Sequence, residues 1–281
     1  MTEREVKSDN HVRGGHYGRT MAVDLLHHVE RESARFAEVL AGTDPATRVP
    51  SCPEWSALDL AWHLTEVHHF WAVIVRDRLT DPDPAEASTP PRPADLPAVL
   101  ALYDRVTAEL LDALAGADDA EAVWTWAPEQ EVGFVRRFQA HEALMHRVDA
   151  ELAAGALTPL PAELAADGVE VVLRYTMTWR PNWSPWQPAG GVGLLRATDT
   201  GGRWTAALGT WGGTSPATGK TYEAQPCVQL RDGGDPTFTV SAPAADLDAW
   251  LWHRPGFGEV TVGGSAEDFA RLQAQVEQGV Q

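Results

Sequence analysis

Cysteine is scarce in this sequence, which excludes two kinds of architecture. Only Cys52 and Cys227 occur in 281 residues. Two thiols can form neither the disulfide framework of a small secreted protein nor the cysteine-rich ligand set of a structural zinc site. Cys52, in the segment SCPEW, can be imagined as a nucleophile near a helix N-terminus. A structural role in that segment is the simpler interpretation.

Positive charge is also scarce. The chain has 22 Lys and Arg against 40 Asp and Glu, with a formal net charge of −18 and a pI of about 4.8. Phosphate backbones and anionic lipid headgroups repel such an acidic protein. We therefore expect neither a nucleic acid nor a membrane as a partner.

Long hydrophobic runs are missing as well. No apolar run reaches the roughly 18 residues of a membrane span, and the N-terminus lacks the apolar segment of a signal peptide. Together with the few cysteines, this predicts a cytoplasmic protein. Hydrophobic residues nevertheless make up 44% of the chain. This is enough for one large domain or two ordinary ones, in a monomer or a homodimer.

The first half of the chain has the apolar periodicity of helices. After a polar tail at residues 1–14, expected to be mobile, four such stretches follow. The second begins after Ser56, which with Asp59 resembles a capping box. Four helices with one long connection between the second and the third predict a four-helix bundle. The expected helices cover residues 19–40, 56–79, 94–114 and 133–154.

The sequence pattern changes near residue 157, so we expect one domain at 15–157 and another at 158–281. A helix is expected over 161–178, followed by a loop rich in Trp and Pro. Short strand-like segments separated by Gly-Gly pairs then predict an antiparallel sheet accompanied by helices, an α+β domain. The expected strands are 192–200, 203–210, 227–232, 236–243 and 259–264, and the expected helices are 244–254 and 265–278.

The segment HEALMH, residues 141–146, gathers titratable groups on one helix. It is not the zinc-protease motif H-E-x-x-H, because its histidines are five residues apart instead of four. Glu142 and His146 are the pair spaced four apart, so they share one face, and Asp149 returns to the same stripe. A solvated face is the plain alternative. A metal site would need a third ligand from elsewhere.

The helix expected over 56–79 offers that ligand in His63, which falls within the apolar stripe of Leu60 and Leu64. Such a histidine is more often a hydrogen-bonded core residue than a ligand. However, helical bundles build metal sites from side chains on facing helices. His63, Glu142 and His146 would then form the two-histidine, one-glutamate set of catalytic zinc. Asp149 could orient His146, or instead pair with Arg147 or Arg137.

Two segments, RVPSCPEWSALDLAWHL and GFVRRFQAHEALMHRVDA, resemble the signature regions of the mycothiol-dependent maleylpyruvate isomerase family. Later segments, LLRATDTGGRWT and ADLDAWLWHR, resemble the small second domain of that family. The resemblance implies a mixed α and α/β fold: an N-terminal DinB-like four-helix bundle and a C-terminal α+β domain. It also implies that a divalent metal binds to His63, Glu142 and His146. We expect zinc first, although these ligand types would also accept nickel or another first-row ion.

The ligand set alone leaves two chemistries open. A cation with an open position can lower the pKa of a bound water, as in hydrolases, or hold an external thiol as its thiolate. The resemblance implies the thiol, mycothiol of actinobacteria, adding to the cis double bond of maleylpyruvate and then leaving after rotation. An S-transferase would stop after addition. Arg254 is the expected catalytic cation and, with Arg196, binds the cosubstrate, unless both are ordinary surface arginines.

The loop from Thr178 to Gly190 departs from that expectation, since Trp179, Trp183 and Trp186 make it more aromatic than a small dicarboxylate requires. It either packs between domains or accepts a larger, flatter electrophile. A protein that binds metal and ligand without turnover is an alternative from another class. The enzyme interpretation is favoured, with Asp149 and Arg254 as its catalytic residues.

Overall fold

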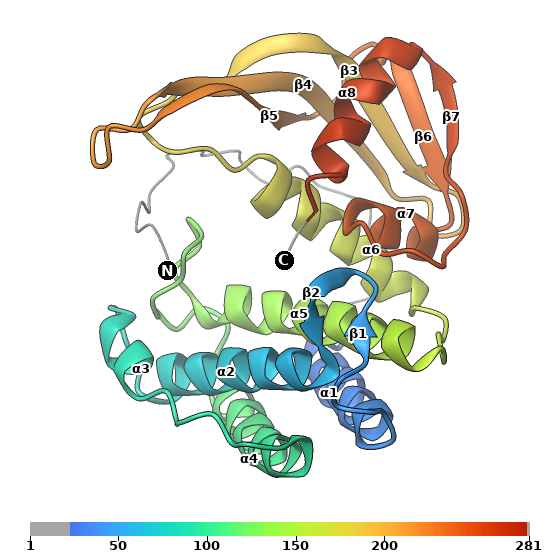
Figure 1. Ribbon diagram of the computed structural model, residues 1–281. Coiled ribbons are helices and arrows are strands. Elements are labelled where there is room, and N and C mark those ends of the chain that lie inside the picture. Colours follow the sequence, from blue (N-terminus) through green and yellow to red (C-terminus); the bar gives the residue numbers. More distant parts are fainter. Residues whose placement is uncertain (1–22, 280–281) are drawn as a thin grey trace. The chain divides into compact units, whose positions relative to one another are not determined.

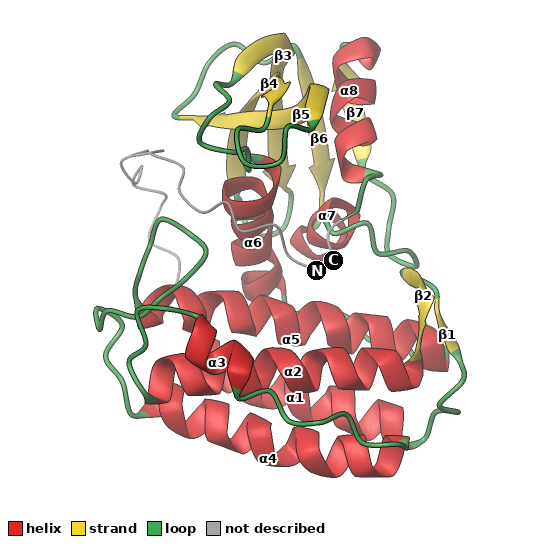
Figure 2. Ribbon diagram, turned by 60° about the vertical axis from the view of Figure 1, so that its left-hand side comes forward, coloured by secondary structure: helices red, strands yellow, loops and turns green. Residues whose placement is uncertain are grey.

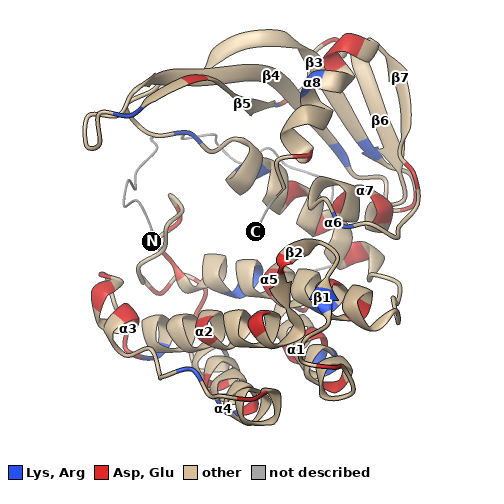
Figure 3. Ribbon diagram, viewed as in Figure 1, with Lys and Arg blue, Asp and Glu red and all other residues tan. Residues whose placement is uncertain are grey.

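The computed structural model describes residues 23–279, and these form two compact units that divide between Pro159 and Leu160 (Figure 1). The expected tail, residues 1–14, and the start of the first expected helix lie outside the described residues. Within those residues, no helix is both long and apolar enough to span a membrane. Acidic residues are distributed over both units (Figure 3), in keeping with the net charge of −18.

Four long helices make up most of the N-terminal unit. Figure 2 shows them lying side by side; α1 packs on α5, and α2 packs on α4. The proline-rich connection between α2 and α4 carries one more, short helix, which the sequence did not predict. The helices are α1 (Leu25–Ala41), α2 (Ala57–Arg76), α3 (Asp83–Ala87), α4 (Leu96–Ala115) and α5 (Val132–Ala154).

Local sequence explains where these helices begin and end. Ser56 and Asp59 form the predicted capping box, in which each side chain bonds to the backbone of the other. Helix α2 ends at Arg76, earlier than the expected Leu79, because Arg78 takes a positive φ of 53°. Gly155 adopts a φ of 66° at the end of α5, a conformation that glycine reaches without steric cost.

A small hairpin precedes α2 and was not predicted from the sequence. Its strands are β1 (Arg48–Val49) and β2 (Cys52–Ser56). Cys52 is only 2% exposed and belongs to the hydrophobic core of this unit, together with Phe36, Leu60 and Tyr103. A thiol packed in a core acts as a small hydrophobic side chain.

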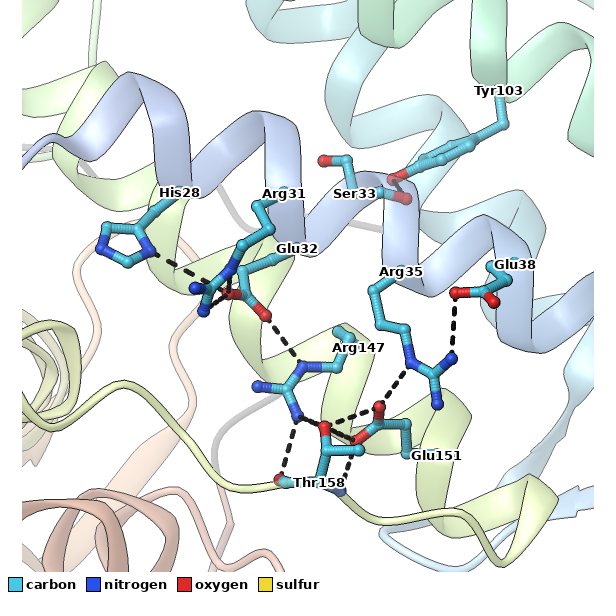
Figure 4. Close-up of polar contacts among 10 residues, drawn as sticks. All are labelled: His28, Arg31, Glu32, Ser33, Arg35, Glu38, Tyr103, Arg147, Glu151 and Thr158. Carbon is cyan, nitrogen blue, oxygen red and sulfur yellow. Dashed lines mark hydrogen bonds and ion pairs between the residues drawn. The ribbon is translucent and has the colours of Figure 1, made fainter.

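The interior of the N-terminal unit also holds buried charges, shown in Figure 4. The Arg147 guanidinium, 2% exposed, donates from Nε to Glu32 over 2.9 Å and from Nη1 to Glu151 over 2.8 Å. It also donates to the carbonyl and hydroxyl oxygens of Thr158. These bonds join α1, α5 and the chain that follows α5, so the rotation of α5 about its axis is tied to α1.

The C-terminal unit combines helices with one five-stranded sheet. Helix α6 (Ala162–Val171) continues into η1 (Val172–Met177), a π-helical stretch inside the single helix expected over 161–178. The remaining elements are β3 (Gln187–Ala197), β4 (Arg203–Thr214), β5 (Thr221–Arg231), β6 (Phe238–Ala242), α7 (Ala244–Leu251), β7 (Thr261–Gly264) and α8 (Ala266–Val276).

The sheet is mixed, and the expectation of an antiparallel sheet was wrong in this respect. Its strand order is β5-β4-β3-β6-β7, and β6 pairs with β3 in parallel while the other neighbours are antiparallel (Figure 1). The chain after β5 therefore crosses to the far side of β3 instead of turning back. Gly193 permits this pairing, because a Cβ there would lie 2.5 Å from the ring of its partner Phe238.

Candidate metal centre

Three side chains of the N-terminal unit converge at one point. His63 comes from α2, and Glu142 and His146 come from α5; each offers one ligand atom, and these atoms lie within 4.8 Å of one another. His146 Nε2 lies 3.2 Å from Glu142 Oε2, and the rings of His63 and His146 meet edge to face at 4.9 Å. The structure thus brings together the three residues that the sequence singled out as candidate ligands.

Asp149 lies behind His146, on the side away from Glu142. Its Oδ2 is 3.0 Å from His146 Nδ1, and its Oδ1 accepts a bond of 2.5 Å from the hydroxyl of Ser51. A carboxylate at Nδ1 holds a proton on that nitrogen and leaves the Nε2 lone pair for the opposite side. Ser51, in the hairpin turn, was missed from the sequence because it is 98 residues from Asp149.

The two histidines differ in basicity. Burial, followed by the nearby charge of His146, lowers the pKa of His63 to about 4. Burial also acts to lower the pKa of His146, but its hydrogen bonds to Asp149 and Glu142 outweigh that effect and raise the pKa to about 9. His63 is therefore a free base at neutral pH, whereas His146 carries a proton that a cation would have to displace.

The donor set fits a divalent cation. Two imidazole nitrogens and one carboxylate oxygen are the protein ligands of many catalytic zinc sites, which keep one position open. The three ligand atoms lie within 4.8 Å of one another, and this limit is little more than twice the zinc–ligand bond length of about 2.0–2.2 Å, so small side-chain rotations would bring all three to one cation. The carboxylate behind His146 is the usual outer partner of a metal-bound histidine.

Two further buried polar groups lie along the same helices. His68 of α2 bonds to Thr107 through Nδ1 over 2.8 Å and stacks on Tyr103. Its Nε2 has no hydrogen-bond partner among the described residues, and the same holds for both side-chain atoms of Gln139. Gln139 shares the stripe of Glu142, three residues earlier on α5. Its spacing from Glu142 was the available signal in the sequence, and it was missed.

An aromatic neighbour of the histidines was also missed. Trp55 of β2 packs its ring 4.7 Å from that of His63 and 6.4 Å from that of His146. In the sequence, Trp55 stands only as part of the segment that precedes α2. His69, in contrast, bonds to Ser88 over 3.0 Å and is not one of the three converging residues.

The two candidate arginines belong to the C-terminal unit. Arg254 follows α7 and is 6% exposed, with its Nη1 donating to the carbonyl of Trp252 over 2.7 Å. Arg196 lies on β3, exposed and directly opposite Arg203 on β4. Arg254 is thus not the ordinary surface arginine that the sequence left open, whereas Arg196 is at the surface.

Comparisons with known proteins give matches to one kind of protein. A family model described as mycothiol maleylpyruvate isomerase N-terminal domain matches residues 26–151, which include the three converging side chains. A search of curated proteins gave no match.

Two solved structures are similar in fold. One is a crystal structure of the mycothiol-dependent maleylpyruvate isomerase, with 15% identity and a TM-score of 0.53, covering 87% of this chain and 94% of that chain. The other is a histidine-to-alanine mutant of that enzyme, with 14% identity, a TM-score of 0.54 and the same coverage. At such low identity, the similarity concerns the mixed helical and sheet fold.

Proposed function

Since this chain belongs, through residues 26–151, to the family of the mycothiol maleylpyruvate isomerase N-terminal domain, we propose that it is a thiol-dependent isomerase. The observation that carries the proposal is the convergence of His63, Glu142 and His146 inside the matched residues. The substrate is a small electrophile with a cis double bond, of the maleylpyruvate type. The protein acts in the cytoplasm, as a monomer or homodimer.

The proposal extends to the architecture. The four long helices α1, α2, α4 and α5 would constitute a DinB-like bundle whose task is to hold the cation. Its domain would cover residues 15–157, and an α+β domain would follow at 158–281. In support, the two facing helices α2 and α5 supply all three candidate ligands, the arrangement by which helical bundles build metal sites.

Each residue of the centre has a proposed task. His63, Glu142 and His146 would hold a divalent cation, zinc first by their donor set. Such a cation lowers the pKa of a thiol that reaches it, so that the thiol reacts as a thiolate at neutral pH. Asp149 keeps the proton of His146 on Nδ1, supported by the hydroxyl of Ser51.

The reaction would proceed by addition and elimination. The thiolate would add to one carbon of the cis double bond, and the π electron pair of the double bond would move toward the adjacent carbonyl group. The remaining carbon–carbon single bond could then rotate. Return of the electron pair would break the carbon–sulfur bond, give the trans isomer and restore the thiolate. Arg254, with Arg196 as a second cation, would pair with the substrate carboxylate or the thiol cosubstrate.

A turnover assay tests the proposal. The purified protein is supplied with maleylpyruvate, with and without mycothiol, and fumarylpyruvate is followed by its absorbance. We expect turnover only with the thiol, loss of turnover in His63→Ala and retention in the control His69→Ala. Turnover without thiol would point to a hydrolase or lyase, a stable thioether product to an S-transferase, and no turnover with any electrophile to a binding protein.

A further inference from the structure

The C-terminal unit contains a cavity of about 250 Å³ that the proposed chemistry does not use. It lies among the end of η1, the paired strands β4 and β5, and the last turn of α8. Trp179 and Trp211 supply aromatic surface, Met177 and Leu251 supply aliphatic surface, and Gln225 and Gln275 supply amide groups. Among the described residues, no Asp, Glu, Lys, Arg or His lines the cavity.

Two backbone irregularities border this cavity. On one side is η1, whose wide π-helical turn ends at Met177. On the other, Trp211 pairs with Gln225, but the next pair is Gly213 with Tyr222, so β5 bulges. Ala224 in that bulge has a φ of 44°, which is unfavourable for alanine. Such π-turns, bulges and strained residues recur at binding sites, because they aim side chains that regular structure would not.

Of the two tryptophans that line the cavity, Trp211 is buried and Trp179 is exposed. Trp211 is 7% exposed and is held edge to face by Trp183, with ring centroids 5.9 Å apart. Trp179 meets Trp211 at 5.9 Å and 80°, but it exposes 53% of its own surface. An indole that is so exposed beside a fixed aromatic wall can stack on a flat ring and bury apolar area.

The amide groups are oriented by the backbone. Gln275 Nε2 donates to the carbonyl of Met177 over 2.9 Å, and Gln225 Nε2 donates to the carbonyl of Glu223 over 2.8 Å. Each bond fixes the plane of an amide and leaves its oxygen to accept from a ligand hydroxyl or N–H group. The cavity therefore combines stacking surface with preset hydrogen-bond acceptors.

We propose that this cavity binds an uncharged planar aromatic compound of one or two rings that carries a hydrogen-bond donor. An apolar cavity of about 150 Å³ holds one benzene ring, so a volume of 250 Å³ suits one or two fused rings. A charged ligand would lose hydration without meeting an opposite charge in the lining. The inference concerns the C-terminal unit alone and does not rest on the metal or the thiol.

Calorimetric titration with 2-naphthol, an uncharged two-ring compound with one hydroxyl, tests the proposal. We expect saturable binding to one site, in chelator-treated protein as in untreated protein. Trp179→Ala should weaken binding about tenfold, since the stacking surface is lost. Thr176→Trp, which fills the cavity from η1, should abolish binding. The matched control Trp250→Phe alters a tryptophan of the same unit outside the lining and should bind as the wild type does.

Two comparison ligands define the chemical class. The anion 2-naphthoate has the same rings, and myo-inositol is an uncharged polyol; both should bind at least tenfold more weakly. Absence of saturable 2-naphthol binding, or equal binding in wild type, Trp179→Ala and Thr176→Trp, would overturn the proposal. Tighter binding of 2-naphthoate or myo-inositol would overturn the assigned class. Because chelator-treated protein is used, these outcomes are independent of whether the proposed isomerase activity exists.

Discussion

His146 Nδ1 lies 3.0 Å from Asp149 Oδ2, and Asp149 is fully buried one turn further along α5. A carboxylate in that place fixes which imidazole nitrogen is available to a cation. Ser51 completes the arrangement by donating to the other carboxylate oxygen. The three candidate ligands are therefore surrounded by an outer layer of hydrogen bonds from Asp149 and Ser51.

Asp149→Asn should weaken metal binding by about 10-fold to 100-fold, the usual effect of losing a carboxylate partner of a ligating histidine. The fold should persist, since asparagine has the same shape. Affinity is measured by competition with a chromophoric chelator. Ser51→Ala, the graded control, removes one hydrogen bond and should cost about fivefold. An unchanged affinity in Asp149→Asn would show that Asp149 has no part in the site.

Protein purified without added metal should contain about one divalent ion per chain, and His63→Ala should contain little. The reason is that His63 is the one candidate ligand supplied by α2. Elemental analysis measures the content, and His69→Ala is the matched control on the same helix. Fewer than about 0.2 equivalents in wild type, with no gain on reconstitution, would remove the proposed site.

Arg147→Met should lower the free energy of unfolding by about 3–5 kcal/mol, because it leaves Glu32 and Glu151 buried without their shared guanidinium (Figure 4). Chemical denaturation measures the change. Arg105→Met is the control: Arg105 lies 4.0 Å from Glu109 at the surface, where an ion pair contributes about 1 kcal/mol or less. Equal effects of the two substitutions would contradict the assigned role of the buried network.

Asp248 of α7 should make the stability of the protein depend on pH. It is fully buried against Gly168, and burial holds the pKa of its carboxyl well above the usual value. Below the unfolded-state pKa both states are protonated. Above it only the unfolded state ionises, so stability falls as pH rises, by up to about 1.4 kcal/mol per pH unit until the folded-state pKa is passed.

Asp248→Asn should therefore stabilise the protein more at about pH 8 than at about pH 5. Thermal unfolding at the two pH values measures the difference. Asp104→Asn, an exposed aspartate on α4, removes the same charge and should show no such trend. An equal shift of the melting temperature at both pH values would show that Asp248 does not ionise differently in the folded and unfolded states.

Features set by neighbours in sequence were predictable. The capping box of Ser56 and Asp59 spans three residues, and the proximity of Glu142 and His146 follows from four-residue spacing on a helix. Helical periodicity also located α2, α4 and α5 to within a few residues. In each case the interacting groups are fixed by one turn of backbone geometry.

Features set by packing between distant segments were not predictable. Ser51 donates to Asp149, which is 98 residues away in the sequence. Trp55, whose ring lies 6.4 Å from that of His146, belongs to a hairpin that the sequence did not predict. The parallel pairing of β6 with β3 sets Gly193 opposite Phe238, where only a residue without a Cβ leaves room for the ring, and no periodicity reveals this partner. Such contacts are decided by the fold as a whole, so only the structure identifies them.

Calorimetric titration of the metal-loaded protein with mycothiol shows whether the thiol binds as a thiolate at the centre formed by His63, Glu142 and His146. Repeating the titration in buffers of different ionisation enthalpy reports the protons released. We predict tight binding with release of about one proton, and no comparable binding to metal-free protein. Tight binding without proton release, or equal binding to metal-free protein, would contradict the account.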